Sequence, residues 1–520
     1  MFEEECHTRI IAKHLKQDYP LLILLSIATA GLFHNLSVGS LPPFDDTTYA
    51  LVSKTILKTG DWLTMRWLDI PYFVFGKPPL NFWITALFYK MLGISEFSSR
   101  ISAAIHGLMG VALVYFVGRK FYSRKVGIAA GAFLLSFPDY FRLSQSAMLD
   151  VPVTFYMVFS LLAYLLACRN GMSIWYVVSG ISIGLGIMTK NVVGLVPLVA
   201  IALLHLIERK PSNLVTSQFC SLLAALLLIA VPWHLWEYAS YGISFLEKYL
   251  LGTITYNALE VLNQAQRSSP FFYVRTLYAN DPVHWIAFLV SLPGLAILAI
   301  RKHRESLLIL VYTALVLLLF TASKTRMPWY IAPAFPTMAI SAAVGISKIQ
   351  EVRRLRRAIT VLLIGFFIYS MAALYRTDHW YLRGDADLKQ IILEFKSKTS
   401  VSDVLFCYGF GEPVNTGAFY GDRKVVVLTN SNDELRIQTQ ISDYLKAGVV
   451  QFVNNEDAMA HLVCSSRSHD IIFRRQAFHV FETKLEAQAV TTFAENASYV
   501  IVHLPCVEPR ELTRQGASAN

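Results

Sequence analysis

The stretch DVPVTFYMVFSLLAYLLAC, residues 150–168, predicts a membrane-spanning helix, because an apolar run of this length can cross a bilayer as one helix. It begins at Asp150 and is followed directly by Arg169. Comparable runs of about 18–22 residues recur through residue 375 and predict a multi-pass α-helical membrane protein. We count eleven, at roughly 20–40, 100–118, 126–145, 150–168, 173–190, 191–207, 214–235, 283–300, 306–322, 328–347 and 357–375.

Composition agrees with a membrane protein. The 520 residues are 54% hydrophobic and 16% charged, with a mean hydropathy of +0.45, which soluble domains rarely reach. The net charge of +10 lies mainly in short loops, so it indicates membrane topology and not nucleic-acid binding. The first span follows a basic leader and has no small-residue cleavage site, so we expect an uncleaved anchor.

Short basic loops set the predicted topology. With the N-terminus in the cytoplasm, every inner turn is basic, which is the positive-inside pattern. These turns are RKFYSRK (119–125), Arg169, Arg209-Lys210, RKHR (301–304) and RRLRR (353–357). The outer side then receives the loop 41–99, the turn at Asp150, the loop 236–282, the turn SKTRMPWY (323–330) and everything after residue 375.

This topology divides the chain into two predicted domains. Residues 1–375 form a transmembrane domain that includes the outer loop 41–99, in which 46–58 and 79–93 suit helices lying at the membrane interface. Residues 376–520 form a soluble extracytoplasmic α/β domain. That domain mixes a helical pattern, DADLKQIILEFKSK, with short β-rich runs, DVLFCYG, KVVVLT and ASYVIVHL.

Cysteines and histidines give weaker signals. The six cysteines show no CxxC or Cys/His metal spacing, and Cys407, Cys464 and Cys506 leave an extracytoplasmic disulfide open. His106, inside a span, is expected to be a packed polar residue, whereas the sequence does not decide whether the outer His234 and His284 join a site. A short glycosylation pattern, Asn-Ala-Ser, occupies 496–498.

Charged residues gather on the predicted outer face. They are the carboxylates of Asp45, Asp46 and Asp150 and the cations of Lys77, Lys190, Lys324 and Arg326. Charges near hydrocarbon are costly and usually have partners or functions. A carboxylate can deprotonate an acceptor hydroxyl, and cations can hold a phosphate and stabilise it as a leaving group. Transfer from a polyprenyl-phosphate sugar needs both a base for the acceptor hydroxyl and cations for the departing phosphate.

Five ordered motifs resemble the ArnT/PMT-like GT-C glycosyltransferases, which include aminoarabinose transferases acting on lipid A and protein O-mannosyltransferases. The resemblance runs over about residues 20–375. The motifs are FDDTTYA (44–50), GDWLTMRWLDIPYFVFGKPPLNFW (60–83), AMLDVP (147–152), LGIMTKNVVGLVP (185–197) and SKTRMPWYIAPAFP (323–336).

The resemblance implies roles for individual residues. Asp45 corresponds to the catalytic carboxylate of the family. Asp46 occupies a position that often holds glutamate, and Asp150 corresponds to the family's second aspartate. Lys77 takes the place of the lysine that contacts donor phosphate, and Tyr330 that of a tyrosine in an LPxYxxP-like segment. We add Lys190, Lys324 and Arg326 as candidate phosphate-binding residues.

Two departures argue against naming the chain an aminoarabinose transferase. Thr48 replaces an arginine, which suggests a differently built phosphate pocket that uses Lys324 or Arg326. Gly76 replaces a glutamate, which puts a copied metal site in doubt, so no cofactor is indicated and a divalent metal ion stays open.

Each residue also has a purely structural interpretation. Asp46 or Thr47 can cap a helix starting near Thr48, and Asp150 can cap its own span. Lys77 can be a lysine that reaches to the interface, and Tyr330 an aromatic of the interfacial belt.

We expect an inverting glycosyltransferase in a bacterial inner membrane. Its donor is a polyprenyl-phosphate-linked sugar, and its acceptor is lipid A or another glycolipid, a polysaccharide or a protein. The surrounding lipids are its other partners. The alternatives are a transporter or flippase of a lipid-linked substrate, or a non-catalytic protein that binds one. Transporters tend to place charges near the bilayer midplane in repeated halves, a pattern not found here.

Overall fold

The computed structural model describes residues 19–68, 70–73, 76–252, 269–351, 356–376, 384–408, 412–429, 450–452, 469–482 and 491–504. The chain forms two compact units. The first unit comprises Met1–Ser37 and Phe75–His379, and the second comprises Val38–Val74 and Trp380–Asn520. The domain boundary near residue 375 stays a prediction, but the structure groups 38–74 with the C-terminal part of the chain.

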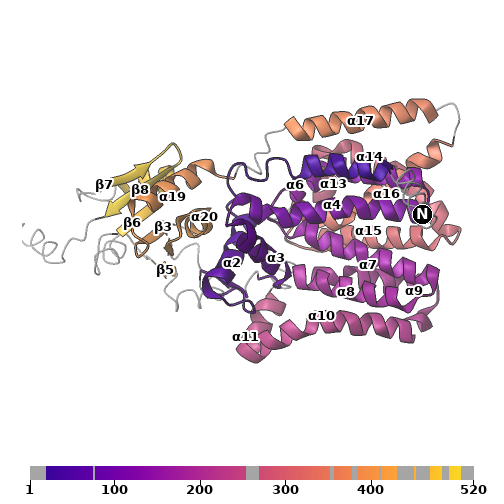
Figure 1. The fold of residues 1–520 in the computed structure, drawn as a ribbon, viewed down its shortest axis with the longest axis horizontal. Coiled ribbons are helices and arrows are strands. Elements are labelled where there is room, and N and C mark those ends of the chain that lie inside the picture. Colours follow the sequence, from indigo (N-terminus) through magenta and orange to yellow (C-terminus); the bar gives the residue numbers. More distant parts are fainter. Residues whose placement is uncertain are drawn as a thin grey trace, which may run out of the picture. The chain divides into compact units, whose positions relative to one another are not determined.

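The first unit is helical, and its long helices run side by side (Figure 1). Helix α7 packs between α4 and α8, and α10 packs on the far side of α8. The helices are Tyr19–Leu32, α3 (Leu80–Leu92), α4 (Glu96–Phe121), α5 (Arg124–Ser136), α6 (Pro138–Ser144), α7 (Asp150–Asn170), α8 (Ser173–Lys190), η1 (Asn191–Leu195), α9 (Val196–Ile207), η2 (Pro211–Val215), α10 (Ser217–Tyr241), α11 (Ile243–Phe245), η3 (Leu246–Leu251), α13 (Phe272–Asn280), α14 (Pro282–Ile300), α15 (Arg304–Ala322), η6 (Pro328–Ala334), α16 (Phe335–Ile349) and α17 (Arg356–Arg376).

Eight helical segments of the described chain are long and apolar enough to cross a membrane. Two of the eleven predicted spans, 20–40 and 126–145, are shorter than expected. The first is helical only over Tyr19–Leu32. The second ends as α5 at Ser136, because Pro138 disfavours helical geometry at Phe137, which is extended with φ −65° and ψ 114°.

The continuous segment Ser173–Ile207 contains two helices that reverse direction, as the sequence predicted. Asn191 adopts φ 46° and ψ −133° immediately after α8. A Cβ placed on Gly194 would meet the amide nitrogen of Ile187 at 2.2 Å. An unbroken helix would separate residues 187 and 194 by about 10 Å along its axis, so the chain turns back at Lys190–Asn191.

Basic loops at 119–125, Arg169 and 301–304 lie at one end of the helices in the first unit. Arg169 donates to the carbonyl of Lys120 at 3.1 Å, and Tyr122 and Ser306 share a 2.9 Å hydrogen bond between their hydroxyls. Asp150, by contrast, begins α7, about 30 Å away along the helix axis. The structure therefore separates the basic end from the end that carries Asp150, as the predicted topology requires.

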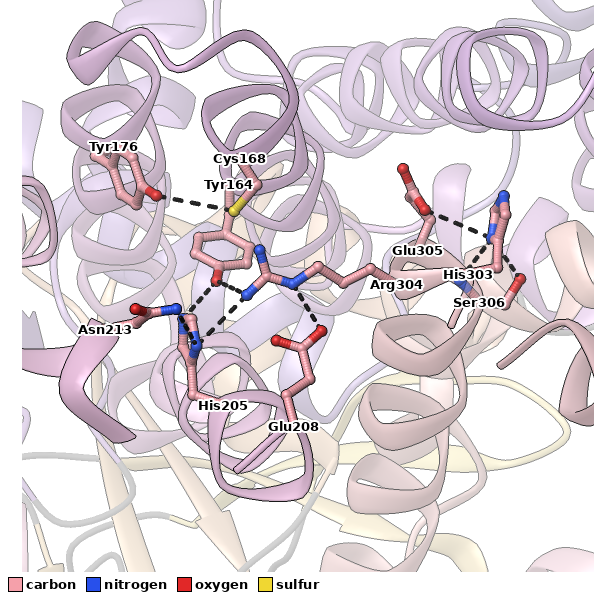
Figure 2. Close-up of polar contacts among 10 residues, drawn as sticks. All are labelled: Tyr164, Cys168, Tyr176, His205, Glu208, Asn213, His303, Arg304, Glu305 and Ser306. Atoms are coloured by element: carbon pink, nitrogen blue, oxygen red, sulfur yellow. Dashed lines mark hydrogen bonds and ion pairs between the residues drawn. The ribbon is translucent and has the colours of Figure 1, made fainter. Parts of the chain in front are cut away.

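A polar cluster, which we call the inner cluster, ties α7, α9 and α15 together at the basic end (Figure 2). The Tyr164 hydroxyl and His205 Nε2 lie 2.7 Å apart, and Arg304 donates to the Tyr164 hydroxyl at 3.1 Å. The same guanidinium pairs with Glu208 at 3.0 Å. Asn213 reaches the other histidine nitrogen at 3.4 Å. These contacts link three helices of the bundle, so we interpret the inner cluster as structural.

We predict that Arg304→Ala lowers the stability of the helical unit by about 1–3 kcal/mol, because it removes charge-assisted bonds to Tyr164 and Glu208. The thermal midpoint in detergent measures the effect, with Arg301→Ala as a control on an exposed neighbour. Equal midpoints for the two variants would contradict the structural role.

The second unit contains a six-stranded sheet in the order β5-β4-β3-β6-β8-β7. Strands β5, β4, β3 and β6 pair in parallel, whereas β8 is antiparallel to both β6 and β7. The strands are β3 (Val404–Tyr408), β4 (Lys424–Thr429), β5 (Val450–Phe452), β6 (His469–Arg474), β7 (Thr491–Glu495) and β8 (Tyr499–Leu504). The three predicted β-rich runs are confirmed as β3, β4 and β8, and the predicted α/β character is confirmed.

Helices pack on this sheet and bury its apolar face. Helix α19 (Ala386–Lys398) buries Leu388, Ile391, Ile392 and Phe395 against it. The other helices among the described residues of this unit are α2 (Asp45–Thr59), α20 (Glu412–Gly421) and α23 (Arg475–Glu482). A two-stranded hairpin of β1 (Arg66–Trp67) and β2 (Ile70–Pro71) follows α2.

Two minor sequence expectations fall in this unit. Cys407 is a free, buried thiol on the central strand β3, while Cys464 and Cys506 lie outside the described residues. The side chain of Asn496, in the glycosylation pattern, accepts from the amides of Ser498 and Tyr499 and donates to the Asp387 carbonyl at 2.7 Å. Asn496 therefore shapes the turn between β7 and β8.

Candidate functional site

A buried ion pair joins two helix ends in the first unit. Asp150 is the first residue of α7, and Lys190 is the last residue of α8. Lys190 Nζ lies 2.6 Å from Asp150 Oδ1, and the two side chains are only 12% and 2% exposed. Asp150 does not cap its own helix, whose first turn has no side-chain cap, so the capping interpretation is wrong. Its carboxylate instead fixes the lysine.

The chain reversal after α8 brings predicted residues together. Lys190 lies over the ring of Tyr330, with 5.4 Å from Nζ to the ring centroid, a distance that permits a cation–π contact. Asn191 Nδ2 donates to the carbonyl of Gly76 at 3.3 Å. That bond ties the segment carrying the half-buried Lys77 to the same helix end. Asp150, Lys190, Tyr330 and the Lys77 segment thus share one end of the bundle.

Arg326 and Lys324 behave differently from each other. The Arg326 guanidinium donates from two nitrogens to the carbonyl of Thr321, at 3.0 and 2.8 Å, and so caps the end of α15. Burial raises the pKa of the Tyr273 hydroxyl on α13, and the charges of Arg326 and Asp150 act on it in opposite directions. Arg326 and Asp150 therefore both lie near Tyr273. Lys324 is exposed.

The predicted base and its neighbour lie in the second unit, in the first turn of α2. Asp46 is buried and Asp45 is half-exposed. Within the described chain, no side-chain hydrogen bond or ion pair engages the Asp45 carboxylate. The N-cap position is Phe44, which makes no side-chain cap, so capping by Asp46 or Thr47 is wrong. The positive end of the helix dipole favours negative charge in this first turn.

Segment 38–74 is fastened to α20 within the second unit. Trp67 Nε1 donates to Asn415 Oδ1 at 2.7 Å, and Asn415 Nδ2 donates to Thr48 Oγ1 at 2.8 Å. Lys54 on α2 pairs with Asp422, just after α20, as does Lys396 from α19. Helix α2 is thus held by residues more than 350 positions away in the sequence.

Acidic pH should weaken the ion pairs that Asp422 forms with Lys54 and Lys396. Partial burial opposes ionisation of Asp422, but hydrogen bonds from Lys396 and Lys54 hold its pKa below the ordinary value of 3.8. A carboxyl whose folded pKa is depressed stabilises the fold above its ordinary pKa and loses that contribution as the pH falls. Burial lowers the pKa of Lys54 despite Asp422. The net contribution should therefore be at most about 1 kcal/mol.

We predict that the thermal midpoint falls more steeply below pH 4 in wild type than in Asp422→Asn. Asparagine keeps the left-handed backbone that Asp422 adopts at φ 52° but cannot titrate. Thermal unfolding in detergent between pH 3 and pH 6 measures the difference. Parallel pH dependences of the two proteins would contradict the assigned role.

The histidines do not join the candidate site. His106 bonds to the Ser102 carbonyl at 2.7 Å and to the Tyr156 hydroxyl at 3.2 Å, which confirms it as a packed polar residue. His284 is buried between Asp281 and Ser136, at 2.7 and 2.9 Å. His234 bonds to the Ala230 carbonyl and to Tyr249.

Metal-binding groups were searched among the described residues. No set of three or more histidine, cysteine, aspartate or glutamate side chains there is arranged to hold a metal ion. A divalent metal ion stays open, as the sequence left it.

Sequence reasoning missed three contributors. Asn191 follows Lys190 and adopts a positive φ, which asparagine tolerates better than most residues, so its position offered a signal for the reversal. Tyr273 and Asn415 offered none, because their importance depends on contacts that are distant in sequence.

Sequence comparison finds relatives among glycosyltransferases. Residues 76–236 match the family described as dolichyl-phosphate-mannose-protein mannosyltransferase. The undecaprenyl phosphate-alpha-4-amino-4-deoxy-L-arabinose arabinosyl transferase of Erwinia tasmaniensis is 27% identical over 318 residues, which cover 58% of this chain and 54% of the relative. The transferase of the same name from an Enterobacter species is 26% identical over 348 residues, covering 63% of this chain and 59% of the relative. The matches thus span less than two thirds of these relatives.

Structural comparison identifies the fold. The crystal structure of ArnT from Cupriavidus metallidurans bound to undecaprenyl phosphate aligns with a TM-score of 0.77 and 18% identity, covering 94% of this chain and 98% of that one. The archaeal oligosaccharyltransferase AglB from Archaeoglobus fulgidus aligns with a TM-score of 0.52 and 13% identity, covering 79% and 64%. The chain is therefore a multi-pass membrane protein with the GT-C fold, as the sequence predicted, and it resembles ArnT and, over residues 76–236, the mannosyltransferase family.

Proposed function

Starting from the GT-C fold, we propose that this chain is an integral-membrane glycosyltransferase that uses a polyprenyl-phosphate-linked sugar. The observation that carries the proposal is the arrangement at one end of the first unit. Asp150 fixes the nearly buried Lys190 over Tyr330, and the Lys77 segment is bonded to the adjacent residue. Such a set of cations suits a phosphate at the membrane boundary.

The proposed reaction is a single displacement at the anomeric carbon. An acceptor oxygen forms a bond to that carbon while the bond from carbon to phosphate oxygen breaks. Asp45 takes the acceptor proton, and the polyprenyl phosphate leaves with the bonding electrons. One displacement inverts the anomeric configuration, through a transition state that resembles an oxocarbenium ion.

Each remaining residue has a proposed part. Lys77 and Lys190 hold the departing phosphate and stabilise its charge. Asp150 keeps Lys190 in place through their 2.6 Å contact. Arg326, Lys324 and Tyr330 complete the electrostatic surroundings, and Asp46 packs beside the base.

The proposed partners and location follow from the relatives. The donor is an undecaprenyl- or related polyprenyl-phosphate sugar, by analogy with the substrate named for the arabinosyl transferases. The acceptor is lipid A or another glycolipid, a polysaccharide or a protein. We place the protein in a bacterial inner membrane, with a cytoplasmic N-terminus and a periplasmic C-terminal domain, from the positive-inside pattern.

Transfer by the purified protein in nanodiscs tests the proposal. A panel of polyprenyl-phosphate sugars is offered with lipid A, glycolipid and peptide acceptors, and products are identified by mass spectrometry. We expect transfer from at least one donor, with inverted configuration in the product. Donor movement across the bilayer without transfer would instead support the transporter or flippase, and donor binding alone would support a non-catalytic protein.

A further inference from the structure

We infer that Asn415, in the C-terminal α20, is a positioning residue that holds the first turn of α2 and so aims Asp45. The inference rests on the proposed function of Asp45 as base. The Asn415 side chain connects two points of segment 38–74. It accepts from Trp67 Nε1 at 2.7 Å and donates to Thr48 Oγ1 at 2.8 Å.

The start of α2 needs such support because it has no ordinary helix cap. Phe44 at the N-cap position cannot accept a hydrogen bond from the first-turn amides through its side chain. The Thr48 hydroxyl bonds back to the Phe44 carbonyl at 2.8 Å while it accepts from Asn415. Through the Thr48 hydroxyl, the side-chain amide of Asn415 is therefore linked to Phe44 and Thr48, which flank Asp45 in the sequence.

Other contacts hold the chain that leads into Asp45. The Leu41 amide donates to the Tyr420 hydroxyl at 2.8 Å, and Lys389 donates to the Gly39 carbonyl at 2.9 Å. Gly384 lies so close that a Cβ there would meet Ser40 Oγ at 2.4 Å. Helices α19 and α20 thus hold the residues that precede α2. Of the side chains named here, only that of Asn415 bonds to the first turn of α2.

A general base works only within hydrogen-bond reach of the proton that it removes, so small displacements of Asp45 should slow the reaction. We therefore expect Asn415→Ala to lower kcat by about ten- to hundredfold while the KM for the donor changes less than about twofold. Lys398→Ala is the matched control, because it removes an exposed ion pair to Glu394 in the same unit without touching segment 38–74.

A double-mutant cycle separates positioning from general destabilisation. Once Asp45→Asn has removed the base, adding Asn415→Ala should cause no further loss of rate, because there is no base left to aim. Losses that multiply in the double variant would overturn the inference. Thermal midpoints of all four proteins confirm that each is folded at the assay temperature.

Hydrogen exchange gives a readout that does not depend on activity. Asn415→Ala should raise amide exchange in peptides covering residues 41–50, whereas Lys398→Ala should leave these peptides unchanged. Unchanged exchange together with wild-type kcat would refute the positioning role. These measurements distinguish a failure of the proposed function from a failure of the positioning role. If wild type transfers no sugar, the proposed function fails, whereas the exchange result still decides whether Asn415 holds α2.

Discussion

We expect Asp45→Asn to lower the proposed sugar transfer by about a hundred- to ten-thousand-fold, which is the usual contribution of a general base. Asparagine keeps the size of the side chain and its hydrogen-bonding capacity but cannot take up the acceptor proton. In the described structure Asp45 is half-exposed and its carboxylate is not engaged by another side chain, so the change should leave folding intact.

The measurement is transfer from a polyprenyl-phosphate sugar in nanodiscs over a range of donor concentrations. Donor binding should stay close to that of wild type, because the loss falls on kcat. Asp46→Asn is the comparison within the same helical turn. It should lower transfer far less, since we assign Asp46 a packing role on account of its burial. Near-normal turnover of Asp45→Asn would remove Asp45 as base, and Asp46 and Asp150 would then be the acids to consider.

Removing either member of the Asp150–Lys190 pair should cost about 3–5 kcal/mol of stability, because the remaining charge would be buried without its partner. Asp150→Ala should also release Lys190 from its place over Tyr330, so transfer should fall with stability. Thermal unfolding in detergent, together with transfer at a temperature where each variant is folded, separates the two losses.

The exchanged pair is the sharper test. Asp150→Lys combined with Lys190→Asp restores opposite charges across the 2.6 Å contact and should recover part of the stability lost in either single variant. It should not recover transfer, because a carboxylate now occupies the position proposed for a phosphate-binding lysine. Full recovery of both would show that the pair is only structural. No recovery of stability would show that the exchanged side chains cannot form the contact.

The fold class could be predicted from the residues alone, because the length of an apolar run is a local property of the chain. Apolar runs read from single segments predicted most of the helices, and the basic loops at 119–125, Arg169 and 301–304 meet at one end, as positive-inside reasoning requires. Local rules also predicted α2, α3 and three strands of the C-terminal sheet. Span lengths were wrong where a local breaker intervened, as at Pro138.

Which charged side chains have partners depends on how the helices pack. The predicted topology places Asp150 and Lys190 on the same side of the membrane. Their 2.6 Å contact depends on how α7 packs against α8. Nothing local links Thr48 to Asn415, which lies 367 residues further along the chain. Helix periodicity follows from neighbouring residues, whereas an ion pair or a positioning hydrogen bond exists only when packing brings side chains within about 3 Å of each other.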